Sequence, residues 1–446
     1  MIRIARRSKV LSGAIVAVAT VAVTAGSALA ASGGIPGPPT AAPGAAKAGQ
    51  TEEAQTGPQT ELTKKQEKLI EVAQKLAAKG KERGSDFAGV SIDPDAQTVH
   101  LFRKDKSKGS GLDSIPAGVT IDVDAAKFSR NEMLAAAQQI TDEAQLLGQQ
   151  FHVTVEAVGP TVDGSGINVT VFASGADDLG KASKALHDKY GTIVNKVNAS
   201  DKKTSESELY FAGWRFNDYA PWYGGDRITT SSGSSCTTGF AATYNGAPVM
   251  LTAAHCGGVG TNFWNGPTSS NGWNFMGSLT SSNTNTDVAT LGVSSYSLSI
   301  NVGSNPQVAS QLYVGSWASP IVGEYLCQSG SFTGERCGLR VVDTAQYVCL
   351  SYVLWWCTSW QGPLADVISI YGSSSPAAGH GDSGGPVYLR TGTSGIAKGL
   401  VHGQLTPNAK AAYPAYYPDT LSCPSPDYGM SNRCSSGFSF AHMPGY

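Results

Sequence analysis

No cysteine precedes Cys236 in this chain of 446 residues, and all eight cysteines lie between Cys236 and Cys434. Lysine is distributed in the opposite way, because only Lys398 and Lys410 occur beyond Tyr210. Disulfides form and persist in oxidising compartments outside the cell. The contrast predicts that the two parts of the chain have different fates, and that the cysteine-bearing part persists outside the cell.

The sequence also lacks the signatures of several function classes. It contains no phosphate-binding loop, no basic nucleic-acid patch, no metal-ligating cluster and no Cys-x-x-Cys pair of the kind that binds zinc. A net charge of −2 argues against a polyanionic partner. We therefore expect no cofactor, no metal and no nucleic-acid partner.

Residues 1–30 have the composition of a secretory signal. Several basic residues precede an apolar run over 10–23, and Ala28-Leu29-Ala30 supplies the small residues that a signal peptidase accepts. An uncleaved membrane anchor is the alternative, but the run is short for a span and is interrupted by Gly13 and Thr20. We expect this segment to be removed and the remaining chain to be free of the membrane.

Residues 31–60 are rich in Pro, Gly, Ala and Thr, which predicts a disordered linker. From Glu61 onward the periodicity of apolar residues changes to helical and then to alternating spacing, and glycines at 80 and 84 end the first helix. Further helices are predicted over 131–149, with Ser129 as N-cap, and over 176–190. Strands are predicted over 88–92, 99–101, 151–155 and 167–171. Residues 61–210 are therefore predicted to form an α+β domain.

The charge and cysteine contrast suggests what becomes of this α+β domain. Because disulfides are confined to the other part of the chain, we interpret residues 61–210 as a pro-region that is removed after folding. A permanent binding or targeting domain is the competing interpretation. The junction at 210–226 is aromatic and glycine-rich, and the cleaved bond cannot be chosen from it.

Residues 211–446 have the composition of a secreted all-β protein. Ser, Thr, Gly and Asn are abundant, charges are few, and short apolar runs alternate with turn residues without any long amphipathic helix. Many short strands at regular spacing indicate a β-sandwich or a β-barrel. Periodicity alone leaves these two architectures equally open.

Two short motifs in this part contain a candidate nucleophile and a candidate base. Gly381-Asp382-Ser383-Gly384-Gly385 places Ser383 between glycines, which allow unusual backbone conformations and a close approach of substrate. Serine is a weak nucleophile and needs a base within hydrogen-bond reach. Leu251-Thr252-Ala253-Ala254-His255-Cys256 supplies a candidate base directly after a strand-like run.

The motif Thr252-Ala253-Ala254-His255-Cys256, followed by Gly381-Asp382-Ser383-Gly384-Gly385-Pro386, resembles the chymotrypsin-fold serine peptidases, and among them the secreted bacterial streptogrisin and α-lytic protease branch. The resemblance covers roughly residues 224–446. It implies two six-stranded antiparallel β-barrels with a cleft between them and an acyl-enzyme mechanism. It also implies a pro-region that assists folding and blocks the site.

The resemblance carries specific roles onto residues of this chain. It implies a catalytic triad of His255, Asp287 and Ser383, with Asp343 as the reserve choice for the acid. The backbone N–H groups of Gly381 and Ser383 would form the oxyanion hole. Asp382 is expected to be structural, buried against a charged or amide partner.

The same resemblance implies two disulfides, Cys236 with Cys256 and Cys327 with Cys337. The remaining four cysteines are paired only by their proximity in the sequence, as Cys349 with Cys357 and Cys423 with Cys434.

Departures from the family pattern bear on specificity. Relatives usually carry a cysteine shortly before the nucleophile, whereas this chain has Ser375-Pro376-Ala377-Ala378 there, so its pocket must be braced differently. The stretch on which substrate backbone would dock reads Val401-His402-Gly403. The expected pocket residues are therefore Ala377, Ala378, His402 and Gly403.

The side chain that this pocket would accept is only loosely indicated. No acidic residue occurs over 372–381, which disfavours a pocket for Lys or Arg side chains. Ala377 and Ala378 favour an apolar side chain, and His402 leaves an acidic one open. His402 could instead hydrogen-bond Asp287 or simply pack. For the aromatic stretch 347–360, the sequence leaves open whether its side chains pack in the core or bind substrate.

These observations predict a secreted serine endopeptidase that is made as a pro-enzyme, acts as a monomer on protein or peptide substrates, and has its own pro-region as inhibitor or folding aid. A non-catalytic, protein-binding relative of the fold is the alternative from another class. Gly381-Asp382-Ser383-Gly384-Gly385 also satisfies the Gly-x-Ser-x-Gly elbow of α/β hydrolases, but a strand-like run follows it where that fold needs a helix.

Overall fold

The structure is a computed structural model, and it describes residues 53–82, 85–173, 175–200, 215, 217–266, 274–305, 310–353, 356–392, 394–416, 420–423 and 433–442. All of these belong to one compact unit, Glu52–Tyr446. The predicted signal, the predicted linker up to residue 52 and most of the predicted processing junction lie outside the described residues. None of the described helices is long and apolar enough to cross a membrane.

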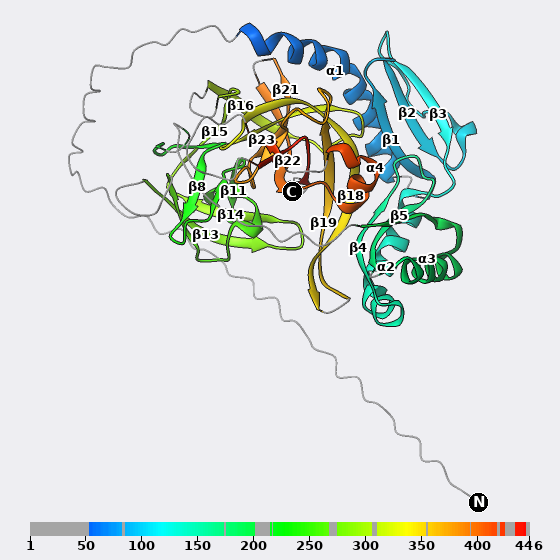
Figure 1. The fold of residues 1–446 in the computed structure, drawn as a ribbon. Helices are drawn as coiled ribbons and strands as arrows, with labels where there is room; N and C mark the ends of the chain where they lie inside the picture. Colours follow the sequence, from blue (N-terminus) through cyan, green and yellow to red (C-terminus); the bar gives the residue numbers. More distant parts are fainter. Residues whose placement is uncertain are drawn as a thin grey trace, which may run out of the picture. The chain divides into compact units, whose positions relative to one another are not determined.

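The first part of the unit mixes helices and strands, as expected (Figure 1). The helix α1 begins at Glu53, inside the stretch predicted to be linker; Glu53, Ala54 and Gln55 favour a helix there, whereas Gly57 and Pro58 disfavour one. Ser129 caps α2: Glu132 N–H donates to its hydroxyl at 3.2 Å, and Glu132 Oε2 accepts from its N–H at 2.7 Å. The elements are α1 (Glu53–Glu82), β1 (Phe87–Asp93), β2 (Thr98–Arg103), β3 (Thr120–Ala125), α2 (Arg130–Phe151), β4 (Val153–Pro160), β5 (Ile167–Ala173), α3 (Ala176–Tyr190) and β6 (Val194–Ala199).

A seven-stranded sheet opens the second part of the unit, in the order β10-β11-β14-β13-β12-β8-β9. Its buried face carries Ile228, Met250, Phe263, Leu279 and Leu291 in one hydrophobic cluster. The strands, with β7 preceding them, are β7 (Trp222–Gly224), β8 (Arg227–Thr230), β9 (Ser235–Thr237), β10 (Ala241–Tyr244), β11 (Ala247–Thr252), β12 (Asn262–Asn265), β13 (Asn274–Asn283) and β14 (Val288–Val293).

Most of the remaining strands enter a sheet of twelve strands, which also contains β7 and, from the first part, β4, β5 and β6; β20, β23 and β24 form a separate three-stranded sheet. The second part is mostly strand and poor in helix, as expected, but its two large sheets have seven and twelve strands, so two six-stranded barrels stay a prediction. The elements are β15 (Tyr296–Val302), β16 (Ser310–Trp317), β17 (Tyr325–Gly330), β18 (Gly334–Val353), β19 (Trp356–Ser369), β20 (Ala378–Gly379), β21 (Pro386–Thr391), β22 (Ser394–Gly403), α4 (Pro407–Ala412), β23 (Leu421–Ser422), β24 (Arg433–Ser435) and β25 (Gly437–His442).

Backbone pairing joins the two parts of the unit. Strand β18 pairs antiparallel with β4, where Tyr347 lies opposite Val158 and Val348 opposite Ala157. Trp360 of β19 packs against the hydrophobic cluster formed by α2, α3, β4 and β5. The aromatic stretch that the sequence left open therefore contacts the predicted pro-region.

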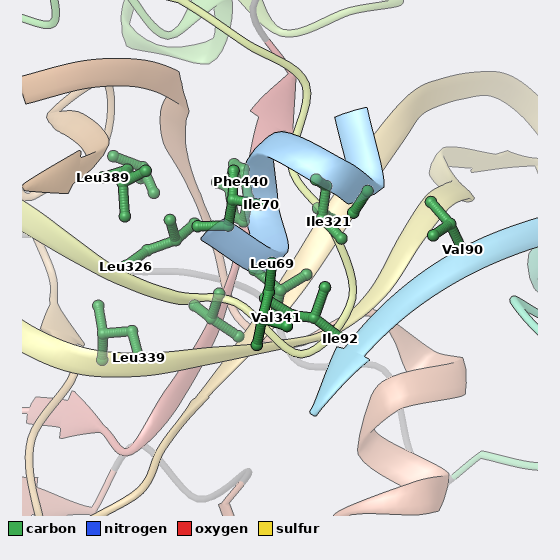
Figure 2. Close-up of a cluster of buried hydrophobic side chains, with 14 of the residues drawn as sticks. Leu69, Ile70, Val90, Ile92, Ile321, Leu326, Leu339, Val341, Leu389 and Phe440 are labelled. Atoms are coloured by element: carbon green, nitrogen blue, oxygen red, sulfur yellow. The ribbon is translucent and has the colours of Figure 1, made fainter. Parts of the chain in front are cut away.

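Helix α1 completes the hydrophobic core beneath β17, β18 and β21. Leu69 and Ile70 are buried among strand residues that include Leu326 and Leu389, as Figure 2 shows. Gln66 fixes the helix at this place, because its Nε2 donates to Tyr325 O at 2.7 Å and its Oε1 accepts from Tyr325 N–H at 2.6 Å. The predicted pro-region thus supplies part of the core of the β-rich part.

Candidate active site

His255 lies on a short turn that is held on both sides. Strand β11 ends at Thr252, and a single 3₁₀ turn then spans Ala254–Cys256. A disulfide joins Cys256 to Cys236 of strand β9, with Cα atoms 6.2 Å apart. The Thr252 hydroxyl donates to Thr237 O at 2.9 Å. These restraints fix the backbone that carries the imidazole.

Asp287 occupies the turn between β13 and β14, and its side chain is fully buried. Its φ of 54° lies in the left-handed region, which short polar side chains such as aspartate tolerate better than most. The backbone N–H of His255 donates to Asp287 Oδ1 at 3.0 Å. The ring atom Nδ1 of His255 lies 2.9 Å from Asp287 Oδ2 and 3.1 Å from Oδ1. The carboxylate therefore holds both the backbone and the ring of His255.

A second imidazole binds the same carboxylate. His402, near the end of β22, has its Nδ1 atom 2.6 Å from Asp287 Oδ2. The rings of His255 and His402 lie edge to face with centroids 5.7 Å apart. The sequence left three roles open for His402: a hydrogen bond to Asp287, a place in the pocket, or packing. In the structure its side chain is hydrogen-bonded to Asp287.

The charge state of Asp287 follows from these contacts. Burial by itself raises the pKa of a carboxyl group, but attraction to His255 and His402 and their hydrogen bonds outweigh it. The pKa of Asp287 is therefore held well below its ordinary value. An ionised, buried carboxylate between two imidazoles results.

The Ser383 loop packs directly against the His255 turn. Thr237 N–H donates to Ser383 O at 2.8 Å, and Cys256 Sγ lies 4.0 Å from the same oxygen. A Cβ at Gly384 would meet Thr252 Oγ1 at 2.3 Å, so only glycine allows this approach. Ser383 itself is half-buried.

Asp382 anchors the loop from below. Its buried carboxylate accepts from the backbone N–H groups of Phe332 at 2.9 Å, Thr333 at 3.1 Å and Gly379 at 2.8 Å, and from the Thr333 hydroxyl at 2.6 Å. Burial raises its pKa, whereas these hydrogen bonds lower it. The partners of Asp382, which sequence reasoning left open, are backbone amides and one threonine.

Two backbone N–H groups in this loop have no partner among the described residues, those of Gly381 and Ser383. The neighbouring amides of Asp382, Gly384 and Gly385 all donate within the protein. Paired free N–H groups beside a serine are what an oxyanion hole needs. Among the described residues no hydrogen bond joins the Ser383 hydroxyl to His255; such bonds are often long in free enzymes and tighten with substrate.

The segment before Ser383 is braced in a way that sequence reasoning missed. Gln328 is fully buried in β17, and its Nε2 donates to Ala377 O at 2.9 Å. The disulfide Cys423–Cys434 lies beside Gly379, where an added Cβ would meet Cys434 Sγ at 2.7 Å. A glutamine on a strand so far away in sequence gives no signal of this contact.

The remaining predicted site residues lie as follows. Ala377 and Ala378 are buried in the hydrophobic cluster that includes Leu69, and Gly403 ends β22. Their role in a pocket stays a prediction. Asp343, the reserve acid, lies opposite Asp366 across β18 and β19, and it is Asp287 that hydrogen-bonds His255.

All four cysteine pairs named above are disulfides in the structure. Cys327–Cys337 crosses β17 and β18, and Cys349–Cys357 crosses β18 and β19. Ligating atoms of His255, Asp287 and His402 lie within 4.8 Å of one another, as metal ligands would. Those atoms are already joined by hydrogen bonds, so the group is explained without an ion.

No family model matches the chain, and no curated protein matches it. Among solved structures, a Nocardiopsis protease is 23% identical and covers 49% of this chain and 91% of its own, with a TM-score of 0.32. Thermobifida fusca protease A is 18% identical; the match covers 50% of this chain and 91% of that protease, with a TM-score of 0.34. A Cellulomonas bogoriensis chymotrypsin is 20% identical, with 50% and 91% covered and a TM-score of 0.32. TM-scores this low do not by themselves indicate a function.

Proposed function

We propose that this chain is a secreted serine endopeptidase, made as a pro-enzyme and active as a monomer on protein or peptide substrates. The observation that carries the proposal is the buried Asp287 carboxylate bound to Nδ1 of His255, on a turn packed against the Ser383 loop. A carboxylate on Nδ1 leaves Nε2 of the ring as the basic atom. A histidine that served only to stabilise the fold would not need a buried carboxylate on Nδ1 and a serine loop packed against its turn.

The proposed reaction proceeds through an acyl-enzyme. Nε2 of His255 takes the hydroxyl proton of Ser383 while Oγ bonds to the peptide carbonyl carbon. The N–H groups of Gly381 and Ser383 hold the oxyanion that forms. The imidazolium then gives its proton to the amine as the C–N bond breaks. Water, deprotonated by Nε2 of His255, then bonds to the acyl carbon; the Oγ–C bond breaks, and the imidazolium returns the proton to Oγ of Ser383 as the acid product leaves.

A fluorophosphonate probe tests the proposal, because it reacts with an activated serine. The secreted protein is treated with the probe, and mass spectrometry maps the adduct and records the amino terminus. We expect labelling at Ser383 in a chain that begins near Gly224, and none in His255→Ala or Ser383→Ala. A folded chain of this processed form that stays unlabelled would contradict the proposal and favour the non-catalytic, protein-binding alternative.

We propose further that residues 61–210 act as inhibitor or folding aid. Burial of Leu69 among strand residues, the paired hydrogen bonds of Gln66 with Tyr325, and the β4–β18 pairing support a role in folding. Removal of α1 after folding would uncover apolar residues such as Leu326 and Leu389, so the folded state must then be kept by other means, including the disulfides.

Leu69→Ala is expected to lower the yield of active enzyme, because truncating a buried leucine costs about 2–5 kcal/mol and so lowers the equilibrium constant for folding of the precursor about 30-fold or more. After processing, the variant and the parent would have identical mature sequences, so kcat per titrated site should be unchanged. Leu146→Ala is the matched control, because Leu146 of α2 is 63% exposed. Equal yields from the two variants would argue against the folding role.

A further inference from the structure

The atoms around Asp287 define which nitrogen of each histidine carries a proton. Nδ1 of His255 lies 2.9 Å from Asp287 Oδ2, and Nδ1 of His402 lies 2.6 Å from the same oxygen. An ionised carboxylate only accepts hydrogen bonds, so both Nδ1 atoms must donate. His402 is therefore a donor through Nδ1, in the same sense as His255.

The backbone next to His402 is bound to the nucleophile loop. Val401 O accepts from Gly384 N–H at 2.7 Å, and Val401 N–H donates to Gly385 O at 2.9 Å. The dipeptide Val401-His402 thus holds the residues that follow Ser383 with its backbone and Asp287 with its side chain. Asp287 lies beside the seven-stranded sheet, whereas β22 belongs to the twelve-stranded sheet.

We propose that His402 is a positioning residue, whose Nδ1–H donates to Asp287 and thereby fixes the carboxylate, and through it the His255 ring, relative to Ser383. The inference rests on the proposed peptidase function and deepens it. His402 touches Asp287 and not the nucleophile hydroxyl, so its effect on the reaction passes through the acid. Side chains that donate from the same place should preserve the arrangement, and side chains that cannot donate should lose it.

Three substitutions separate the donor from the bulk of the side chain. His402→Asn places an N–H donor where Nδ1 stands, His402→Gln places one further along the side chain, and His402→Leu fills similar volume without a donor. We expect kcat to fall about 10²-fold in His402→Leu, with KM changed little, because a misplaced catalytic group costs about this much. His402→Asn should recover most of kcat, and His402→Gln should recover less.

An NMR measurement provides a readout that does not need activity. In the processed protein with ¹⁵N-labelled histidine, Nδ1–H resonances of both His255 and His402 are expected to be protected and shifted by the shared carboxylate. The His255 resonance should remain in His402→Asn and shift in His402→Leu. A parent that shows both resonances but no Ser383 labelling would confirm the two hydrogen bonds to Asp287 and refute the proposed function, and with it the role of His402 in the reaction.

Three results would overturn the inference. The first is a parent protein in which His402 carries its proton on Nε2 and none on Nδ1, which needs no variant to fold. The second is a folded His402→Leu enzyme with kcat within about threefold of the parent. The third is a His402→Asn enzyme as impaired as His402→Leu. Thermal midpoints of all variants are measured beside the kinetics, so that loss of structure is not read as loss of positioning.

Discussion

Replacing Asp287 with asparagine is expected to lower kcat about 10⁴-fold while leaving KM within a few-fold of the parent. Three donors converge on the carboxylate, the backbone N–H of His255 and the two ring Nδ1–H groups. An amide offers one acceptor oxygen and turns an N–H towards the rings, so the His255 tautomer with a basic Nε2 is no longer favoured. Steady-state kinetics on a peptide substrate and the rate of fluorophosphonate labelling measure the loss.

Asp366→Asn is the matched control for this substitution. Asp366 is also a fully buried carboxyl group, and it accepts from the Thr406 N–H at 2.8 Å and the Thr406 hydroxyl at 2.7 Å. Burial raises its pKa to about 8, so it is largely neutral at pH 7 and an amide resembles it. We expect kcat of this variant to stay within a few-fold. An Asp287→Asn enzyme retaining a tenth of the parent kcat would contradict the assignment of Asp287.

The direction of the Asp287 pKa also sets a pH dependence. Because the pKa of the folded state lies below that of the unfolded chain, the stability that Asp287 contributes is present above the unfolded-state pKa. It is lost only as the pH falls through the lower, folded-state pKa. Activity that disappears in the range where imidazoles titrate is therefore expected to report a histidine and not Asp287. Asp287 would instead govern unfolding in stronger acid.

The motifs around His255 and Ser383 could be located from sequence because their restraints are local. A glycine that must approach Thr252, and a cysteine that follows the histidine directly, are visible as letters in the chain. The disulfides Cys349–Cys357 and Cys423–Cys434 could be guessed for the same reason, since 8 and 11 residues separate their partners. Asp287 came only from the family resemblance, because six carboxylate residues lie between His255 and Ser383.

Contacts between distant segments could not be predicted. Gln328 donates a hydrogen bond to Ala377 O, and Gln66 pairs with Tyr325. A glutamine in a strand or on a helix usually indicates only that the position is exposed to solvent. The pairing of β4 with β18 could not be predicted either, because both strands have the ordinary alternation of polar and apolar residues, and neither sequence indicates which strand pairs with it. The contact of His402 with Asp287 was one of several open roles, since one residue type suits all of them.

The proposed oxyanion hole gives the second large expected effect, and it depends on one backbone conformation. Gly381 has a φ of 91°, which side chains other than glycine rarely adopt. A Cβ there would lie 1.9 Å from Cε2 of Phe332. Phe332 is held in turn, because its N–H donates to Asp382 and its ring lies 4.2 Å from the Arg227 guanidinium carbon. Thr237 binds Gly381 O at 2.8 Å, so the loop has no simple way to yield.

Gly381→Ala is therefore expected to lower kcat about 10²- to 10³-fold, the usual cost of losing one oxyanion donor. KM should change little, because the charge on the carbonyl oxygen develops only in the transition state. Gly246→Ala is the control, since Gly246 has a φ of 78° but no atom within 4 Å of an added Cβ. Both variants carry the cost of a strained φ, and only one carries the collision. Equal kcat in the two would show that the N–H of Gly381 takes no part in the reaction.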